Sequence, residues 1–305
     1  MKRIVVLMVI FFVFRSLAAP LFAQEEAVRF MPVSSAGSGG THVAAEEGVY
    51  TLLGNPALLN TVVQAMYLSV SGGIGNVYQN GRIGTTVPPA YYTVTGPLAF
   101  GVVSKGVGFG LFNRFRFHEG GLDAHFVGSI GIDWILINTP GVKLDFGLSP
   151  RFLLSYMQEK PVLLSAAGIT PGILCALGKR FSLGISYDDA ASVAYYMEKS
   201  YSEVTWLSSS LNAGIALNIV SSAALGFTLY ADYRDILAYW DDGAGDPLRQ
   251  LSGGARIDFR NSFHLSLGMF ERAPTAGVGF NLGAVKVEVA FFSNSIEAGI
   301  KIVRE

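Results

Sequence analysis

Hydrophobic and polar residues alternate with a period of two along most of this chain. In residues 211–219 the apolar side chains occupy the odd positions, and Asn, Gly and Ala occupy the even ones. The same alternation recurs in residues 142–148, 262–269, 285–291 and 296–302. A period of two predicts strands with one apolar face. Membrane barrels and soluble sandwiches both show it, so the alternation by itself does not separate these two classes.

The lengths of the connections favour a membrane barrel. The pattern places fourteen strands, at residues 63–74, 90–103, 106–117, 123–137, 142–157, 164–178, 181–196, 203–219, 223–238, 248–259, 262–271, 274–282, 285–293 and 295–303. Single-chain bacterial barrels have an even number of strands, with short turns on one rim and longer loops on the other. Short links alternate with longer ones through the early and middle strands, whereas all links between the last strands are short. We therefore predict an all-β fold, a closed antiparallel transmembrane barrel of about fourteen strands that covers residues 63–305.

A helical membrane protein is the alternative that low charge suggests. Residues 161–178 and 204–231 contain no charged residue and are long enough to span a bilayer as helices. The first window, however, contains Gly168, Pro171 and Gly172, and the second is rich in serine and keeps the period of two. Both windows are therefore predicted to form strands.

Residues 1–23 have the features of a signal peptide. Lys2 and Arg3 precede an apolar run, and small residues precede a predicted cleavage after Ala23. An uncleaved anchor is the alternative reading. Cys175 is the single cysteine, so neither a lipid-modified cysteine at the cleavage site nor an internal disulfide is expected.

Composition agrees with a membrane barrel and excludes one class of partner. Half of the residues are hydrophobic, 15% are charged and the net charge is −1. That balance gives no basic surface for nucleic acid, so no nucleic-acid partner is expected. The predicted partners are a hydrophobic ligand, the lipids of the outer membrane and the barrel assembly machinery, and the pattern leaves the oligomeric state open.

A compact segment at residues 24–62 precedes the strands. It contains the sequence Gly54, Asn55, Pro56, Ala57. Gly54 can adopt the left-handed conformation that ends a short helix. Asn55 is a good N-cap and Pro56 suits the first helical position, so a second short helix is predicted to begin there. A kinked segment of this kind cannot join a sheet, which suggests a plug ahead of a barrel.

These residues also carry a family resemblance. A Gly-rich stretch, a helix-like run and Asn-Pro-Ala directly before the first strand resemble the N-terminal hatch of FadL-type long-chain fatty acid transporters of bacterial outer membranes. Residues 168–189, 223–237 and 254–283 look like successive hairpins of that barrel, and the tails of related spirochaete and Bacteroidetes proteins look similar. The chain departs from the family in its short predicted outer loops and in its end, which lacks a terminal aromatic residue.

The resemblance implies a passive outer-membrane channel for hydrophobic molecules, with long-chain fatty acids as the simplest cargo. In such proteins a hatch moves and a break in the wall lets apolar cargo leave sideways into the bilayer. The alternatives are a scaffold or shuttle that binds partner proteins during secretion, and an open diffusion porin. No catalytic or metal-ligand spacing marks the serines, histidines and aspartates, so neither an enzyme nor a cofactor is expected.

Charged residues share the predicted inward side of the strands. Both signs are present, in the set Arg114, Arg116, Asp133, Lys143, Asp145, Arg151, Asp232, Arg234, Arg256, Asp258, Lys286, Glu288 and Glu297. They suit a network of ion pairs across a narrow lumen, or arginines that receive a carboxylate headgroup. Asp188 and Asp189 are predicted to be exposed charges at a rim, and Asp241 and Asp242 likewise.

Asn113 interrupts the apolar side of the predicted third strand. An amide facing hydrocarbon costs on the order of a few kcal/mol unless it finds a partner. Asn113 therefore either lies at the rim, near headgroups, or marks a bulge that opens the wall. The kink known in the third strand of FadL-type proteins supports the second alternative. Arg114 and Arg116 would then lie near the opening and bind a carboxylate by charge-assisted hydrogen bonds.

Overall fold

The computed structural model describes most of the chain from residue 38 onward. The described residues are 38, 40–45, 48–62, 64–74, 78–79, 82–83, 91–92, 98–118, 121–157, 162–198, 201–206, 209–236, 250–260, 262–270, 273–292 and 295–304. The predicted signal peptide and residues 24–37 lie outside this set, as do Asp241 and Asp242.

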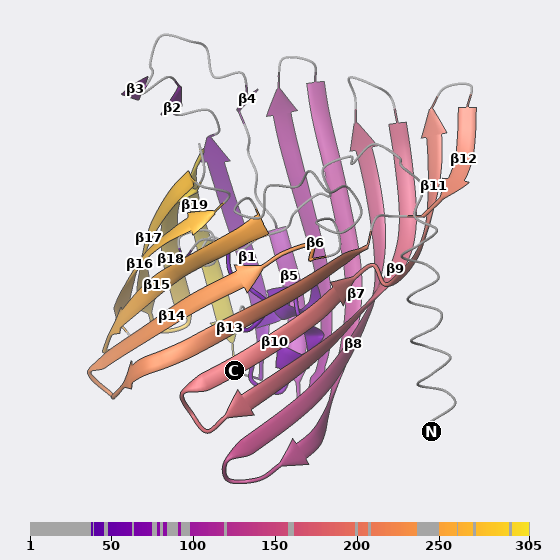
Figure 1. Ribbon diagram of the computed structural model, residues 1–305. Helices are drawn as coiled ribbons and strands as arrows, with labels where there is room; N and C mark the ends of the chain where they lie inside the picture. Colours follow the sequence, from indigo (N-terminus) through magenta and orange to yellow (C-terminus); the bar gives the residue numbers. More distant parts are fainter. Residues whose placement is uncertain are drawn as a thin grey trace.

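The described strands form a closed antiparallel barrel (Figure 1). They are β1 (Ala65–Ile74), β4 (Tyr91–Tyr92), β5 (Leu98–Ser104), β6 (Val107–His118), β7 (Gly121–Asn138), β8 (Val142–Met157), β9 (Val162–Leu177), β10 (Phe181–Asp188), β11 (Ala191–Glu198), β12 (Tyr201–Thr205), β13 (Ser210–Ser221), β14 (Leu225–Tyr233), β15 (Leu251–Phe259), β16 (Phe263–Phe270), β17 (Ala273–Leu282), β18 (Val285–Phe292) and β19 (Ser295–Arg304). β1 pairs with β5 on one side and with β19 on the other, which closes the ring. A separate small hairpin joins β2 (Tyr78–Gln79) to β3 (Arg82–Ile83).

We call each strand position around the barrel wall a stave. The seventeen strand segments of the barrel fill fourteen staves, because three staves each contain two segments. β4 and β5 both pair with β6, β10 and β11 both pair with β9, and β12 and β13 pair with β11 and β10 respectively. Each stave corresponds to one of the strands predicted from the sequence, so the predicted fold class is confirmed. The breaks within staves were not predicted, because a period-two pattern continues on both sides of them.

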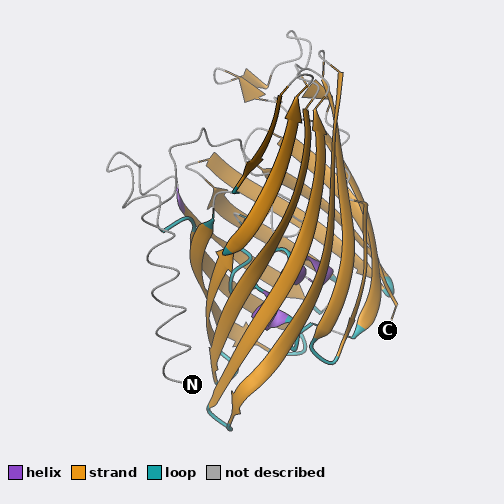
Figure 2. Ribbon diagram, turned by 90° about the vertical axis from the view of Figure 1, so that its right-hand side faces the viewer, coloured by secondary structure: helices purple, strands orange, loops and turns teal. Residues whose placement is uncertain are grey.

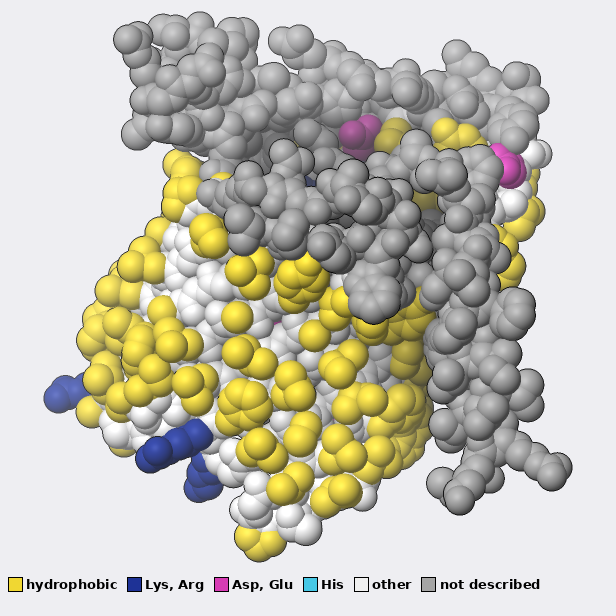
Figure 3. Space-filling view, in the orientation of Figure 1, with side chains coloured by type: hydrophobic (Ala, Val, Ile, Leu, Met, Phe, Trp, Pro, Cys, Tyr) yellow, Lys and Arg dark blue, Asp and Glu magenta, His cyan; other side chains and the backbone are white. Residues whose placement is uncertain are grey.

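Side chains alternate across the wall as the sequence predicts. In β13 the side chains of Ile215 and Leu217 are exposed on the outside, whereas Asn212 is buried inside. Figure 3 shows the resulting apolar outer surface over the described strands. A closed barrel whose outer surface is apolar and whose interior is polar is the architecture of proteins that cross a membrane with strands.

The tight turns gather at one rim. Backbone hydrogen bonds join neighbouring turns there, such as those from Gly178 to Gly141, from Asn218 to Arg180 and from Arg260 to Ala224. In Figure 1 these turns lie at the lower end of the barrel. We call this end the short-turn rim. No helix within the described ranges is both long and apolar enough to cross a membrane.

Candidate functional site

Residues 38–62, described except for 39 and 46–47, lie against the inner surface of the barrel, and we call them the inner segment. It contains two short 3-10 helices, η1 (Gly48–Leu52) and η2 (Pro56–Leu58), which contact β5 to β9. Figure 2 shows these helices enclosed by the strands. Val43, Val49 and Asn55 of this segment have no exposed surface.

Asn55 forms the N-cap that the sequence predicts. Its backbone is extended, its side-chain oxygen accepts a hydrogen bond from the N–H of Ala57 (3.1 Å), and Pro56 opens η2. The Asn55 side-chain nitrogen donates to the carbonyl oxygens of Val43 (2.8 Å) and of Ile173 in β9 (3.1 Å). Both N–H groups and the oxygen of the amide are therefore used, and this one side chain ties the turn to the wall.

Gly54 does not have the conformation predicted for it. It is not among the glycines with a positive φ, so it does not end η1 in the left-handed region. The close approach of His42 explains the residue instead, because a Cβ at position 54 would lie 2.8 Å from the His42 ring. The prediction failed because glycine is required here by the packing of His42, twelve positions earlier in the chain, and not by the end of a helix.

Asp232 of β14 holds the beginning of the inner segment. Its Oδ2 atom accepts hydrogen bonds from the backbone N–H groups of His42 (2.6 Å) and Val43 (3.0 Å). The carboxylate is buried, so these charge-assisted bonds lie where water does not compete with them. The sequence analysis placed Asp232 on the inward side but did not identify its partners, which lie about 190 residues away in the chain.

Two further side chains hold the end of the inner segment. The Oδ2 atom of Asp133 in β7 accepts a hydrogen bond from the backbone N–H of Asn60 (2.9 Å), and the Asn60 amide donates to the Asp133 carbonyl oxygen (3.2 Å). Ser149 of β8 donates to the carbonyl oxygen of Leu52 (2.9 Å). The segment is thus attached at its beginning, middle and end by polar contacts to β14, β9, β7 and β8.

Glycines in the wall make room for these contacts. A Cβ at Gly147 would lie 2.2 Å from the backbone nitrogen of Ala57, and one at Gly184 would lie 2.1 Å from the Val43 carbonyl oxygen. Glycines at which a Cβ would also lie close to backbone or side-chain atoms of the inner segment are Gly101, Gly108, Gly131, Gly172, Gly214 and Gly254. Glycine at the inward-facing positions of a strand is the sequence signal that could have located this interface. A glycine within a strand often marks the close approach of another part of the backbone.

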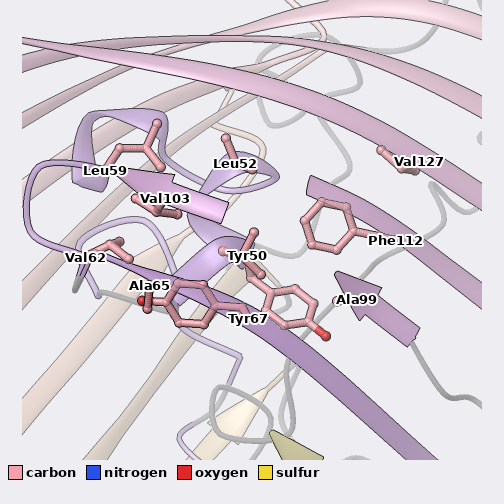
Figure 4. Close-up of a cluster of buried hydrophobic side chains, with 11 residues drawn as sticks. Tyr50, Leu52, Leu59, Val62, Ala65, Tyr67, Ala99, Val103, Phe112 and Val127 are labelled. Carbon is pink, nitrogen blue, oxygen red and sulfur yellow. The ribbon is translucent and has the colours of Figure 1, made fainter. Parts of the chain in front are cut away.

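An apolar cluster completes the interface (Figure 4). Tyr50 of η1 packs against Phe112 of β6, with ring centroids 5.3 Å apart. The buried members of the cluster are Val49, Tyr50, Leu52, Leu59, Val62, Ala65, Tyr67, Ala99, Val103, Phe112 and Val127. The inner segment therefore combines apolar contacts, which involve β1, β5, β6, β7 and β9, with polar contacts to β7, β8, β9 and β14.

Asp188 and Asp189 do not lie exposed at a rim as predicted. They lie where β10 ends and β11 begins, and Asp189 has a positive φ of 50°. The Asp189 carboxylate accepts two hydrogen bonds from the Arg151 guanidinium of β8, through Nε at 2.9 Å and through Nη2. The paired positions Ser186 and Ala191 are five positions apart in the sequence, whereas their β9 partners Gly172 and Ile169 are only three positions apart. This bulge inserts Asp189 next to Arg151, which the local sequence pattern does not reveal.

Asn113, Arg114 and Arg116, the residues predicted to lie at an opening in the wall, are in a regular part of β6. Asn113 is half-buried on the outward side, and β6 pairs with β7 without a register shift. On the other side of β6, Asn113 pairs with Leu98 and Phe117 pairs with Tyr92. Asn113 and Phe117 are four positions apart in β6, whereas Leu98 and Tyr92 are six positions apart, so the irregularity belongs to the stave of β4 and β5. Residues 93–97, which connect β4 to β5 in the chain, are outside the described set.

Arg114 lies on the inward side, close enough to Glu297 of β19 for an electrostatic interaction. Arg116 pairs through its backbone with Asp123, and its side chain is outside the described set. The role predicted for Asn113, Arg114 and Arg116 therefore stays a prediction. No group of three or more potential metal-ligating side chains occurs within the described residues.

Comparison with known proteins gives no match to a family model or to a curated protein sequence. Solved structures do match. The monoaromatic hydrocarbon channel CymD has a TM-score of 0.55 at 14% identity, covering 92% of this chain and 98% of its own. The toluene transporter TodX of Pseudomonas putida has a TM-score of 0.51 at 11% identity, covering 89% and 97%.

The fold is that of FadL-type channels. A FadL homologue of Pseudomonas aeruginosa is also similar, with a TM-score of 0.48 at 9% identity and coverage of 91% and 96%. The resemblance inferred from the strand pattern is confirmed for the barrel fold by the first two structures, whereas the resemblance of residues 37–60 to a hatch stays a prediction. The two comparisons cover almost the whole length of each neighbouring chain.

Proposed function

We propose that this protein is an outer-membrane channel for passive passage of hydrophobic molecules, in which residues 24–62 form a movable plug. The observation that carries the proposal is the way the inner segment is held. It is buried within the barrel, yet side-chain hydrogen bonds from Asn55, Asp232, Asp133 and Ser149 hold it in place of strand pairing. Contacts of this type can be exchanged for others without unfolding the wall.

A plugged barrel suits apolar cargo better than a water-filled pore. A hydrophobic molecule gains nothing from passing through water, whereas a passage lined by side chains and closed to ions can accept it. The first solved structures named above carry titles that describe channels for monoaromatic hydrocarbons and toluene. Long-chain fatty acids remain the cargo that the sequence resemblance suggests, so two cargo classes are to be compared.

A sideways exit beside β6 is part of the proposal. The change of register between the Asn113–Leu98 and Phe117–Tyr92 pairs supports a local irregularity in the wall. Apolar cargo leaving there would enter the bilayer directly. Arg114, on the inward side of the same stretch, would meet a carboxylate headgroup before the exit.

The test is reconstitution of the purified full chain in liposomes. We expect uptake of labelled oleate or labelled toluene above that of empty liposomes, together with low ion conductance. A variant lacking residues 35–60 should insert and conduct ions freely, because a polar-lined barrel of this size admits water once emptied. Free ion flow through the intact chain, or no uptake of either cargo, would overturn the proposal.

A further inference from the structure

Exposed basic side chains are distributed around the short-turn rim. They are Lys105, Lys179, Arg180, Arg260 and Arg304. The described residues of the short turns include no acidic side chain, and no ion pair within the described chain involves any of these five cations. Figure 3 shows dark blue side chains, the colour of Lys and Arg, near the lower edge of the visible face. We call the five residues the basic ring.

The ring follows the circumference of the barrel. Lys105 lies in the turn between the second and third staves, Lys179 and Arg180 between the sixth and seventh, and Arg260 between the tenth and eleventh. Arg304 ends the last stave, where it pairs with Met66 of β1. Exposed cations therefore occur at intervals around the whole rim. A single protein partner would call for a one-sided patch, whereas a surrounding lipid leaflet meets every side of the barrel.

The depth of the ring matches a headgroup layer. Lys105, Lys179 and Arg304 each lie two residues beyond an exposed apolar side chain of the wall, Val107, Leu177 and Ile302 respectively. Two residues of chain span at most about 7 Å, so each of these cations lies within that distance of the apolar belt along its chain. The cations thus begin where the apolar belt ends, and their long side chains can reach phosphate groups while their methylene stems stay against the acyl region.

We propose that the basic ring binds the headgroups of anionic phospholipids in the leaflet at the short-turn rim. Three observations support this interaction: the uniform sign of charge, its continuity with the apolar belt and its distribution around the barrel. Guanidinium and ammonium groups donate hydrogen bonds to phosphate oxygens, and an anionic leaflet attracts basic residues held near its surface. The interaction is independent of the cargo and of any movement of the inner segment.

The experiment compares lipid selectivity in nanodiscs of phosphatidylcholine that contain spin-labelled phosphatidylglycerol or spin-labelled phosphatidylcholine. For the full chain we expect the labelled anionic lipid to be enriched at the protein surface by about threefold or more, an effect that falls at high salt. A variant with Lys105, Lys179, Arg180, Arg260 and Arg304 replaced by Gln should lose the enrichment. A matched variant that exchanges Lys for Arg and Arg for Lys at the same positions should keep it.

Both variants are checked for the heat-modifiable mobility of a folded barrel. If the fivefold variant does not insert, Lys179→Gln with Arg180→Gln, which changes one turn only, should give a partial loss. Equal association of the two lipids with the native chain, or undiminished enrichment in the neutralised variants, would overturn the proposal.

Discussion

The side-chain amide of Asn55 donates a hydrogen bond to the carbonyl oxygen of Ile173, 118 residues further along the chain. Ile173 is part of β9, whose outer side faces the membrane and whose inner side carries Gly172 directly beneath Asn55. A buried amide with all its hydrogen-bonding groups satisfied gives the turn one orientation against the wall. The predictions below test this attachment and the features around it.

Asn55→Ala should weaken the attachment without changing the barrel. The substitution leaves the carbonyl oxygens of Val43 and Ile173 without this donor, which costs on the order of 1–3 kcal/mol of stability for buried groups. We expect a lower unfolding midpoint in urea and a higher ion conductance in planar bilayers. Asn218→Ala is the matched control, because the Asn218 amide donates to Lys179 and not to the inner segment. Similar conductance changes in both variants would contradict the assignment.

Gly147→Ala should displace the turn from the wall. A Cβ at this position would lie 2.2 Å from the Ala57 nitrogen and 2.3 Å from the Pro56 carbonyl carbon, both of which are backbone atoms. Since overpacking costs about 1–3 kcal/mol, we expect lower thermal stability together with increased ion leakage from liposomes. Gly72→Ala adds the same methyl group where no atom lies within 4 Å, so it should leave both properties unchanged.

Arg151 and Asp189 should behave as a coupled pair. Removing one member leaves a largely buried charge, which costs about 3 kcal/mol, so Arg151→Gln and Asp189→Asn should each lower the free energy of unfolding. The double variant should be less destabilised than the sum of the two, with a coupling of roughly 1–3 kcal/mol. Urea unfolding of all four proteins measures it. Strictly additive effects would show that the bulge, rather than the ion pair, stabilises this part of the wall.

Asn113→Val tests the two alternatives for the outward amide. If Asn113 lies near headgroups, neither thermal stability nor cargo uptake should change. If it lines an exit, the variant should be more stable, because a polar amide is removed from the wall, and should transport less. Arg114→Ala is measured beside it, since Arg114 lies on the opposite side of the same strand. Uptake unaffected by both substitutions would remove this stretch of β6 from the pathway.

The sequence by itself determined the wall of this protein. A period of two fixes which side chains face lipid and which face the lumen, because successive side chains of a strand point in opposite directions. Ile215 outside and Asn212 inside follow from that rule alone. The N-cap at Asn55 and the proline after it could also be predicted, since both depend on contacts within a few residues.

The tertiary structure decided everything that joins distant parts of the chain. The carboxylate of Asp232 meets His42, Arg151 meets Asp189, and Gly147 lies beneath Ala57 only because the barrel closes and its register is set. Gly54 and Asp189 were misread for this reason, as their neighbours in space are remote in sequence. Local patterns report the conformation of a segment and the side each residue faces, whereas contact partners across a lumen depend on the number, tilt and pairing of all the strands between them.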